Sequence, residues 1–168
     1  MSLFALLNVA CLGLVAVVLI AASVQDLRTM HIANGLSLAI AGLFAVWAVA
    51  AVASGRMSVE ALAWSVGCGI AVFAVAAAAF VAGVLGGGDV KLLAAMSLFA
   101  GPTRLVDFLT ITALVGGLLG LAILAGAPIG RPVAAGDASL KARLRQGLPF
   151  GPAIAAGGLW VAASLGVN

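Results

Sequence analysis

The sequence predicts an all-α, polytopic integral membrane protein, and two observations support this fold class. The chain of 168 residues is 65% hydrophobic and only 8% charged, with a mean hydropathy of +1.31. Soluble domains carry roughly 25% charged residues on average, so this composition could not cover the surface of a soluble protein. The apolar residues also form long runs, several of them near the 20 or so residues that a helix needs to cross a bilayer.

Polar, glycine and proline residues divide the apolar runs into six hydrophobic helices. Gln25-Asp26-Leu27-Arg28 ends the first run, and Asn34 is a suitable N-cap for the second. Ser54-Gly55-Arg56 ends the second run, and Gly86-Gly87-Gly88 stops the third. Gly101-Pro102 ends the fourth, which is too short to cross a bilayer alone. The expected helices cover residues 3–24, 35–53, 59–85, 90–100, 105–125 and 150–167.

The first run is interpreted as a retained transmembrane helix rather than as a cleaved signal peptide. No Lys or Arg precedes it, and it is longer than the roughly 7–15 apolar residues of a signal-peptide core. We therefore expect residues 1–168 to form a single membrane-embedded domain.

The basic residues predict the orientation of the chain in the membrane, because Lys and Arg accumulate on the cytoplasmic side. With the N-terminus outside, Arg56 and Arg104 lie outside and the other six basic residues lie inside, so this orientation is favoured. The net charge of +3 is explained in the same way and is not read as a sign of nucleic-acid binding. The hydrophilic loop 127–149 carries four of the inside residues, and either a short basic helix on anionic lipid or a solvated loop fits it.

Only five acidic residues are present, and three of them have ordinary structural explanations. Glu60 and Asp107 lie at the outer ends of expected helices, and Asp137 lies in the hydrophilic loop. Asp26 closes the first helix and Asp89 opens the fourth, so both lie at the same membrane boundary in the predicted topology. Ionisable groups within membrane segments usually face the bundle interior or water, which indicates that these two side chains share one site.

Two carboxyl groups in one site offer the chemistry of an aspartic protease, which needs neither a metal nor a covalent intermediate. One carboxylate can take a proton from water while the other carboxyl group donates a proton to a carbonyl oxygen. Gly86 and Gly88 would let the backbone approach an extended peptide closely. Lys91 would either shape the local potential or anchor the helix on the inner side. A helix-capping role for Asp89 and an ion pair of Asp26 with Arg28 remain simpler explanations.

Other catalytic motifs are missing from the sequence. GGGDVK is neither a phosphate-binding P-loop nor a GxGxxG motif, and no HExxH or GxSxG occurs. A single histidine, His31, and two isolated cysteines, Cys11 and Cys68, give no multi-ligand metal site or redox pair. No cofactor or metal is therefore expected.

Three motifs together resemble those of one protease family. Gly86-Gly87-Gly88-Asp89 fits the GxGD motif, Asp26 with Ile32-Ala33-Asn34 resembles a first catalytic aspartate followed by Ile-Pro-Asn, and Pro149-Phe150-Gly151-Pro152 resembles a Pro-Phe-Gly-Pro that opens a last helix. In order and spacing the chain resembles the type IV prepilin peptidases, and its length resembles the short form found with Tad/Flp pilus systems.

This resemblance implies an aspartic endopeptidase of the bacterial inner membrane that cuts on the cytoplasmic side. Its catalytic pair would be Asp26 and Asp89, and its partners would be a prepilin or pseudopilin substrate and membrane lipid. The N-terminal zinc-binding domain of the long, methylating forms is not expected here. Ala33 stands where the family has Pro, which implies a less rigid turn after Asp26.

Three other functions remain open from the sequence. A small proton- or cation-coupled transporter could use Asp26 and Asp89 as its ion sites, although such sites usually lie nearer the membrane midplane. A structural membrane subunit could use both acids as helix caps. A GxGD protease of the preflagellin or signal-peptide-peptidase type would share the catalytic pair.

Overall fold

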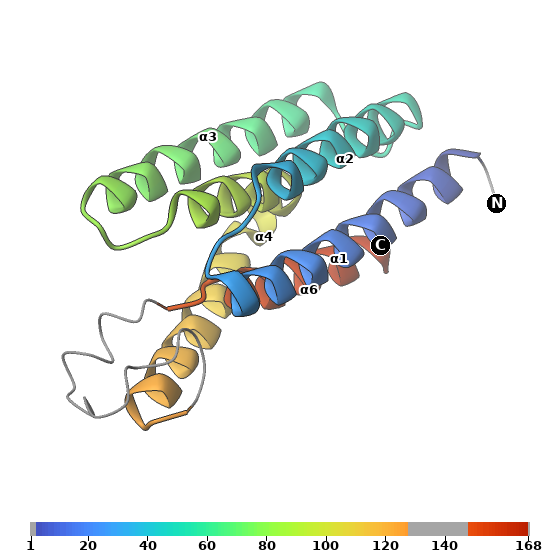
Figure 1. Cartoon of the computed structure of the whole chain (residues 1–168). Helices are drawn as coiled ribbons and strands as arrows, with labels where there is room; N and C mark the ends of the chain where they lie inside the picture. Colours follow the sequence, from blue (N-terminus) through green and yellow to red (C-terminus); the bar gives the residue numbers. More distant parts are fainter. Residues whose placement is uncertain (1–2, 128–147, 168) are drawn as a thin grey trace.

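The computed structural model describes residues 3–127 and 148–167, and within these ranges it is helical with no strand. Four helices are long and apolar enough to cross a membrane: α1 (Leu3–Thr29), α2 (Asn34–Ala53), α3 (Val59–Val81) and α4 (Gly87–Leu124). The fifth, α6 (Gly151–Gly166), is a shorter apolar helix. The prediction of an all-α protein with membrane-spanning helices is confirmed at this level (Figure 1).

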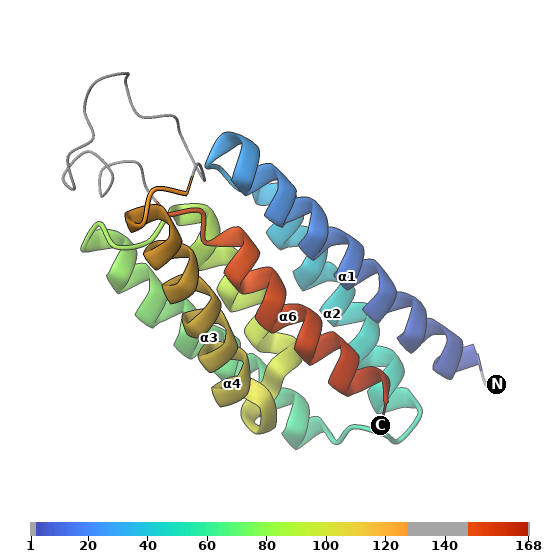
Figure 2. The ribbon, with the colours of Figure 1, turned by 90° about the horizontal axis from the view of Figure 1, so that it is seen from below.

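The prediction of six helices is met only in part for the described residues, because the expected fourth and fifth segments are joined in one element, α4, on either side of an interruption at the predicted break. Gly101 interrupts the helical geometry of α4 with φ 53° and ψ −173°, and Pro102 follows it. This backbone conformation is one that almost only glycine adopts. The chain reverses its direction there, so both ends of α4 lie at the same end of the bundle (Figure 2). The shortness of the first part of α4 is thus explained by a helical hairpin.

Three helix boundaries also differ from the prediction. α1 continues to Thr29, so Asp26 lies in its last turn rather than after it. The helix then stops because Met30 takes a left-handed conformation, with φ 53°, while its N–H still donates to the Asp26 carbonyl at 2.8 Å. α3 ends at Val81, earlier than expected, and α4 begins at Gly87. These differences place both aspartates inside the first or last turn of a helix.

The connections of the chain gather at two ends of the bundle. Figures 1 and 2 show the α1–α2 connection, the α3–α4 connection and the start of α6 at one end. The two described chain ends, the α2–α3 connection and the bend of α4 lie at the other end. Asp26, Asp89 and Gly151 therefore belong to segments that meet at the same end of the molecule.

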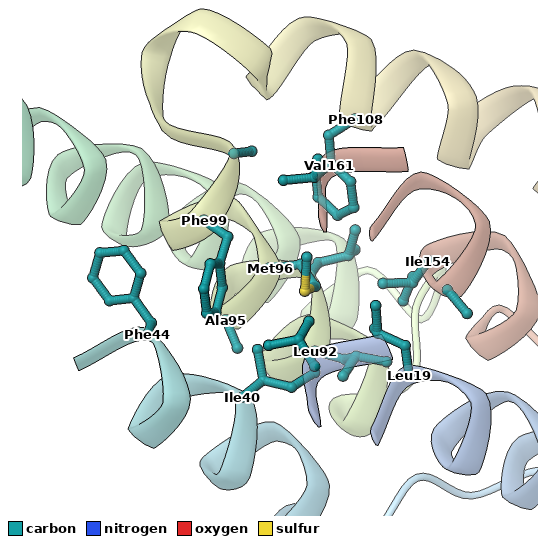
Figure 3. Close-up of a cluster of buried hydrophobic side chains, with 14 of the residues drawn as sticks. Leu19, Ile40, Phe44, Leu92, Ala95, Met96, Phe99, Phe108, Ile154 and Val161 are labelled. Atoms are coloured by element: carbon teal, nitrogen blue, oxygen red, sulfur yellow. The ribbon is translucent and has the colours of Figure 1, made fainter. Parts of the chain in front are cut away.

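The first part of α4 is the centre of the hydrophobic core. Leu92 and Met96 are fully buried and lie among Leu19 of α1, Ile40 of α2 and Ile154 of α6 (Figure 3). Farther along, the rings of Phe44 and Phe99 meet edge to face with centroids 5.3 Å apart. This packing fixes the position of α4, and with it the position of Asp89 at its start.

Two predictions are not tested by the described residues. The basic residues Arg131, Lys141, Arg143 and Arg145 lie outside them, as does most of the loop 127–149, so its lipid-binding role stays a prediction. The structure contains no membrane, so the outside position of the N-terminus also stays a prediction.

Candidate functional site

Asp26 is a buried carboxyl group at the C-terminal end of α1. Its side chain is only 5% exposed. The backbone N–H of Gly151, the first residue of α6, donates to Asp26 Oδ2 at 2.7 Å. The first N–H groups of a helix have no partner within the helix, so a carboxyl group is a suitable acceptor for them. The start of α6 therefore fixes the orientation of the Asp26 side chain.

Asp89 lies in the first turn of α4 and is partly buried. Its Oδ2 accepts a hydrogen bond from the Gly86 N–H at 3.2 Å, and Gly86 is the residue that precedes the helix. Asp89 therefore helps to cap α4, which is the role that the sequence left open beside catalysis. Its other oxygen, Oδ1, is buried and has no hydrogen-bond partner among the described residues. Capping thus uses one oxygen of the carboxyl group and leaves the other for a different contact.

Asp26 and Asp89 line the same pocket, which has a volume of about 290 Å³. α1 and the α1–α2 connection form one side of it, and the start of α4 forms the other. The two carboxyl groups and the imidazole of His31 therefore belong to the lining of one small cavity. The pocket is lined by Asp26, Met30, His31, Ile32, Asn34, Gly86, Gly87, Gly88, Asp89 and Lys91.

The turn after Asp26 is held by a side chain of α1. Gln25 Oε1 accepts a hydrogen bond from the Ala33 N–H at 3.2 Å. Ala33 has φ −66° and ψ 137°, which is the φ value that a proline ring imposes. The structure therefore holds the turn at Ala33 in place without a proline ring. The residue keeps the conformation of proline, and its additional N–H group is bonded.

Lys91 connects α4 to the start of α2. Its Nζ donates to Asn34 Oδ1 at 2.8 Å, and both side chains are exposed. The bond spans the edge of the pocket that both residues line. This contact indicates that Lys91 helps to hold the start of α2 against α4 at the edge of the pocket. Its role as an anchor on the inner side of the membrane stays a prediction.

A comparison with protein families bears directly on these residues. Residues 13–121 match the type IV leader peptidase family, and this range includes Asp26, Asp89 and the three glycines. The chain belongs to the type IV leader peptidase family. Neither the curated proteins nor the solved structures include a match to the chain. The family match identifies the chain as a peptidase, and the resemblance seen in the sequence is confirmed to that extent.

Within this leader peptidase, the structure gives Gly86 and Gly88 a role in packing. A Cβ added at Gly88 would lie 2.9 Å from Ile32 Cβ and 3.0 Å from the Ile32 carbonyl oxygen. A Cβ added at Gly86 would lie 2.8 Å from Asp89 Oδ2. Gly88 thus lets α4 start directly against the turn after Asp26, and Gly86 leaves room for the Asp89 carboxyl group that caps α4. Clearance for a substrate, the role predicted for them from the sequence, stays a prediction.

Sequence reasoning did not include three residues of the site. His31 was considered only as a metal ligand, yet it lines the pocket that contains Asp26. Asn34 was predicted to cap the second helix, but the N-cap of α2 is Ala33, and the Asn34 side chain accepts a hydrogen bond from Lys91 instead. Gly151 belongs to the Pro-Phe-Gly-Pro motif, which lies outside the family match, and its contact with Asp26 connects that motif to the pocket. The motif itself was the available signal for Gly151.

Proposed function

We propose that this leader peptidase is an aspartic endopeptidase that removes the leader of type IV prepilins of the Tad/Flp type. Asp26 and Asp89 are its catalytic pair, and no metal or cofactor takes part. The observation that carries the proposal is that two carboxyl groups, from α1 and α4, line one small pocket at the end of the bundle. Membership of the leader peptidase family supports a peptide bond as the target.

In the proposed reaction a water molecule between the two carboxyl groups attacks the carbonyl carbon of the scissile bond. The carboxylate of one aspartate takes a proton from this water, and the carboxyl group of the other donates its proton to the carbonyl oxygen. The C–N bond then breaks as the leaving nitrogen receives a proton from the pair. The products are a leader with a new carboxylate and a mature chain with a new amine.

The surroundings of the pair are suited to this reaction. The Gly151 N–H donates to Oδ2 of Asp26, and the Gly86 N–H donates to Oδ2 of Asp89. These hydrogen bonds fix the orientation of both carboxyl groups. Asp89 Oδ1 has no competing partner among the described residues. Gly87 and Gly88 line the pocket with backbone rather than side chain, which gives an extended peptide room beside Asp89.

We also propose that the pocket faces the cytoplasm of a bacterial cell, with the N-terminus outside. Arg28 and Lys91 belong to the segments at the pocket end, and Arg56 and Arg104 belong to the α2–α3 connection and the region after the α4 bend. Four more basic residues occur in the sequence between α4 and α6. An excess of positive charge marks the cytoplasmic side of membrane proteins.

Cysteine labelling in intact cells tests this orientation. In a chain whose native Cys11 and Cys68 are replaced by Ala, a membrane-impermeant maleimide should label Arg56→Cys and not His31→Cys. Both native side chains at these positions are exposed and lie near opposite ends of the bundle. The reverse labelling pattern would overturn the orientation and leave the catalytic proposal standing.

The catalytic proposal is tested by co-expression with a prepilin precursor. The wild-type chain should shorten the precursor on a gel, and Asp26→Asn and Asp89→Asn should not. Both Asn side chains retain an oxygen that can accept from Gly151 or Gly86, so folding should persist. Shortening by either variant would sink the proposal, and an ion transporter would shorten no precursor in any form.

A further inference from the structure

A second cavity lies beside the Asp pocket, among α2, α3 and α4. It has a volume of about 480 Å³, and we call it the lateral groove. α4 packs against both α2 and α3, whereas α2 and α3 make little or no direct contact with each other. The first part of α4 therefore forms the floor of the groove, with Ala94 and Leu98, and the other two helices form its walls.

The lateral groove is mainly apolar, and, among the described residues, its one charged and one amide side chain lie where it meets the Asp pocket. Asn34 and Lys91 line both cavities, so the two adjoin each other at the hydrogen bond between these side chains. Away from this junction the described lining is apolar except for Ser37, and the large side chains on the walls are open to the surroundings: Leu38 is 71% exposed and Ile70 is 66% exposed. From Lys91 to Leu98 the floor extends for ~10 Å of helix.

Ser37 supplies an independent observation. It lines the groove one turn of α2 beyond Asn34 and is only 5% exposed. Its hydroxyl group is buried and has no hydrogen-bond partner among the described residues. Buried hydroxyl groups in proteins nearly always have a partner, so this one is suited to a polar group of an incoming chain.

A peptide cut in the Asp pocket must continue away from it on both sides. On the groove side the chain enters apolar surroundings at membrane depth, where unsatisfied backbone groups cost several kcal/mol each. Only a helix satisfies its own backbone there, and only apolar side chains fit this lining. A substrate meets both requirements if its chain is extended at the scissile bond and forms an apolar helix a few residues farther along.

We propose that the lateral groove binds the apolar helix of the substrate, which begins within a few residues of the cleaved bond. The leader lies on the polar side of the pocket, and the segment retained after cleavage lies between α2 and α3. Asn34 and Lys91 contact the chain where it passes from one cavity to the other. This inference rests on the proposed function and adds to it the surface of the enzyme that holds the apolar part of the substrate.

Variants that fill the groove test the inference. Ala41→Phe places a large side chain in the groove, and Ala39→Phe makes the same change at an exposed position of α2 that does not line it. Each is assayed on a full precursor and on a short soluble peptide that contains the cleavage site without the apolar segment. For the full precursor, Ala41→Phe should lower kcat/KM at least about fivefold, because the added ring displaces the substrate helix from the groove and its contacts are lost. Ala39→Phe should not lower it.

For the short peptide, both variants should equal the wild-type chain. Equal cleavage of the full precursor by Ala41→Phe and wild type would overturn the proposed role of the groove and leave the proposed function intact. If Ala41→Phe lost activity on both substrates, the proposed role of the groove would also be overturned, because the substitution would then act on the Asp pocket. A flexible Gly/Ser insertion of about four residues between the cleavage site and the apolar segment, ~13 Å when extended, should slow cleavage as well.

A binding measurement keeps the inference separate from cleavage. A photo-crosslinking amino acid at Ile70, in the cleavage-deficient Asp26→Asn chain, should attach to the apolar segment of the precursor. The same group at Ala71, which is exposed on α3 outside the groove, is the control. Crosslinks from position 70 only to lipid or to a second copy of this chain would overturn the inference, even if the precursor is cleaved.

Discussion

The backbone N–H of Gly151 donates to Oδ2 of Asp26 at 2.7 Å, across 125 positions of the sequence. The bond joins the start of α6 to the end of α1, and its acceptor lines the pocket that also contains Asp89. α1 and α6 pack side by side along their length (Figure 1). The last helix thus positions a carboxyl group that the first helix carries.

Gly151→Ala should lower cleavage activity by about tenfold or more. An added Cβ would lie 2.7 Å from Asp26 Cβ and 3.0 Å from Asp26 Oδ2, so the carboxyl group must move. A displacement of about 1 Å in a catalytic group can reduce the rate by about 10²-fold. The measurement is kcat/KM on a precursor, with thermal unfolding in detergent as a check on folding.

Gly13→Ala is the matched control for that substitution. Gly13 also lies in a helix, α1, and an added Cβ there would meet no atom within 4 Å. Its activity should equal that of the wild-type chain. Equal activity of Gly151→Ala and Gly13→Ala would contradict the positioning role of Gly151.

Gln25→Ala should lower activity about two- to tenfold, because it removes the hydrogen bond that holds the turn after Asp26. Such a bond contributes about 0.5–1.5 kcal/mol. Adding Ala33→Pro to this variant should restore most of the activity, since Ala33 already has φ −66° and a ring would fix that conformation. The check is a comparison of kcat/KM for both single variants and the double variant. A double variant no better than Gln25→Ala would show that the rigidity of the turn is not what matters.

Gly101→Ala should destabilise the fold by about 1–3 kcal/mol, since its backbone conformation is strained for any residue with a Cβ. The added Cβ would also lie 2.9 Å from Ser65 Oγ on α3. Gly117→Ala, in the same helix, meets no atom within 4 Å and should change stability by less than about 1 kcal/mol, in the stabilising direction. Denaturant unfolding in detergent measures both changes. If the two variants lose the same stability, the reversal of α4 does not depend on Gly101.

The sequence was a sufficient guide to the helices wherever hydropathy and capping signals agree. The start of α3 at Val59 and the end of α2 at Ala53 are as predicted. The expected topology, with Lys91 inside and Arg104 outside, implies the reversal in α4, whereas Gly101-Pro102 alone signals a break in a helix without specifying the exact direction of the chain after it. That direction depends on how the second part of α4 packs against α3 and α6.

The meeting of Asp26 and Asp89 was predictable for a physical reason. Few acids occur in this apolar chain, and two of them lie at the same expected membrane boundary. Of the contacts that orient these acids, the capping of α4 by Asp89 was predicted, whereas the bond from Gly151 to Asp26 was not. The donors to both carboxyl groups are backbone N–H groups, of Gly151 and Gly86, and backbone donors carry no signature of residue type. Even the bond between Lys91 and Asn34 depends on the approach of two helices that are distant in sequence.

The central claim is that Asp26 and Asp89 act as one catalytic unit, and a double-mutant cycle on the purified protein tests it most directly. The measured quantity is kcat/KM for cleavage of a precursor by Asp26→Asn, Asp89→Asn and the double variant. Each single variant should lose about 10²- to 10⁴-fold, and the double variant should lose no more than the worse single variant, because residues that act as a unit are not additive. A single variant within threefold of wild type, or a double variant whose loss is the product of the two single losses, would contradict the claim.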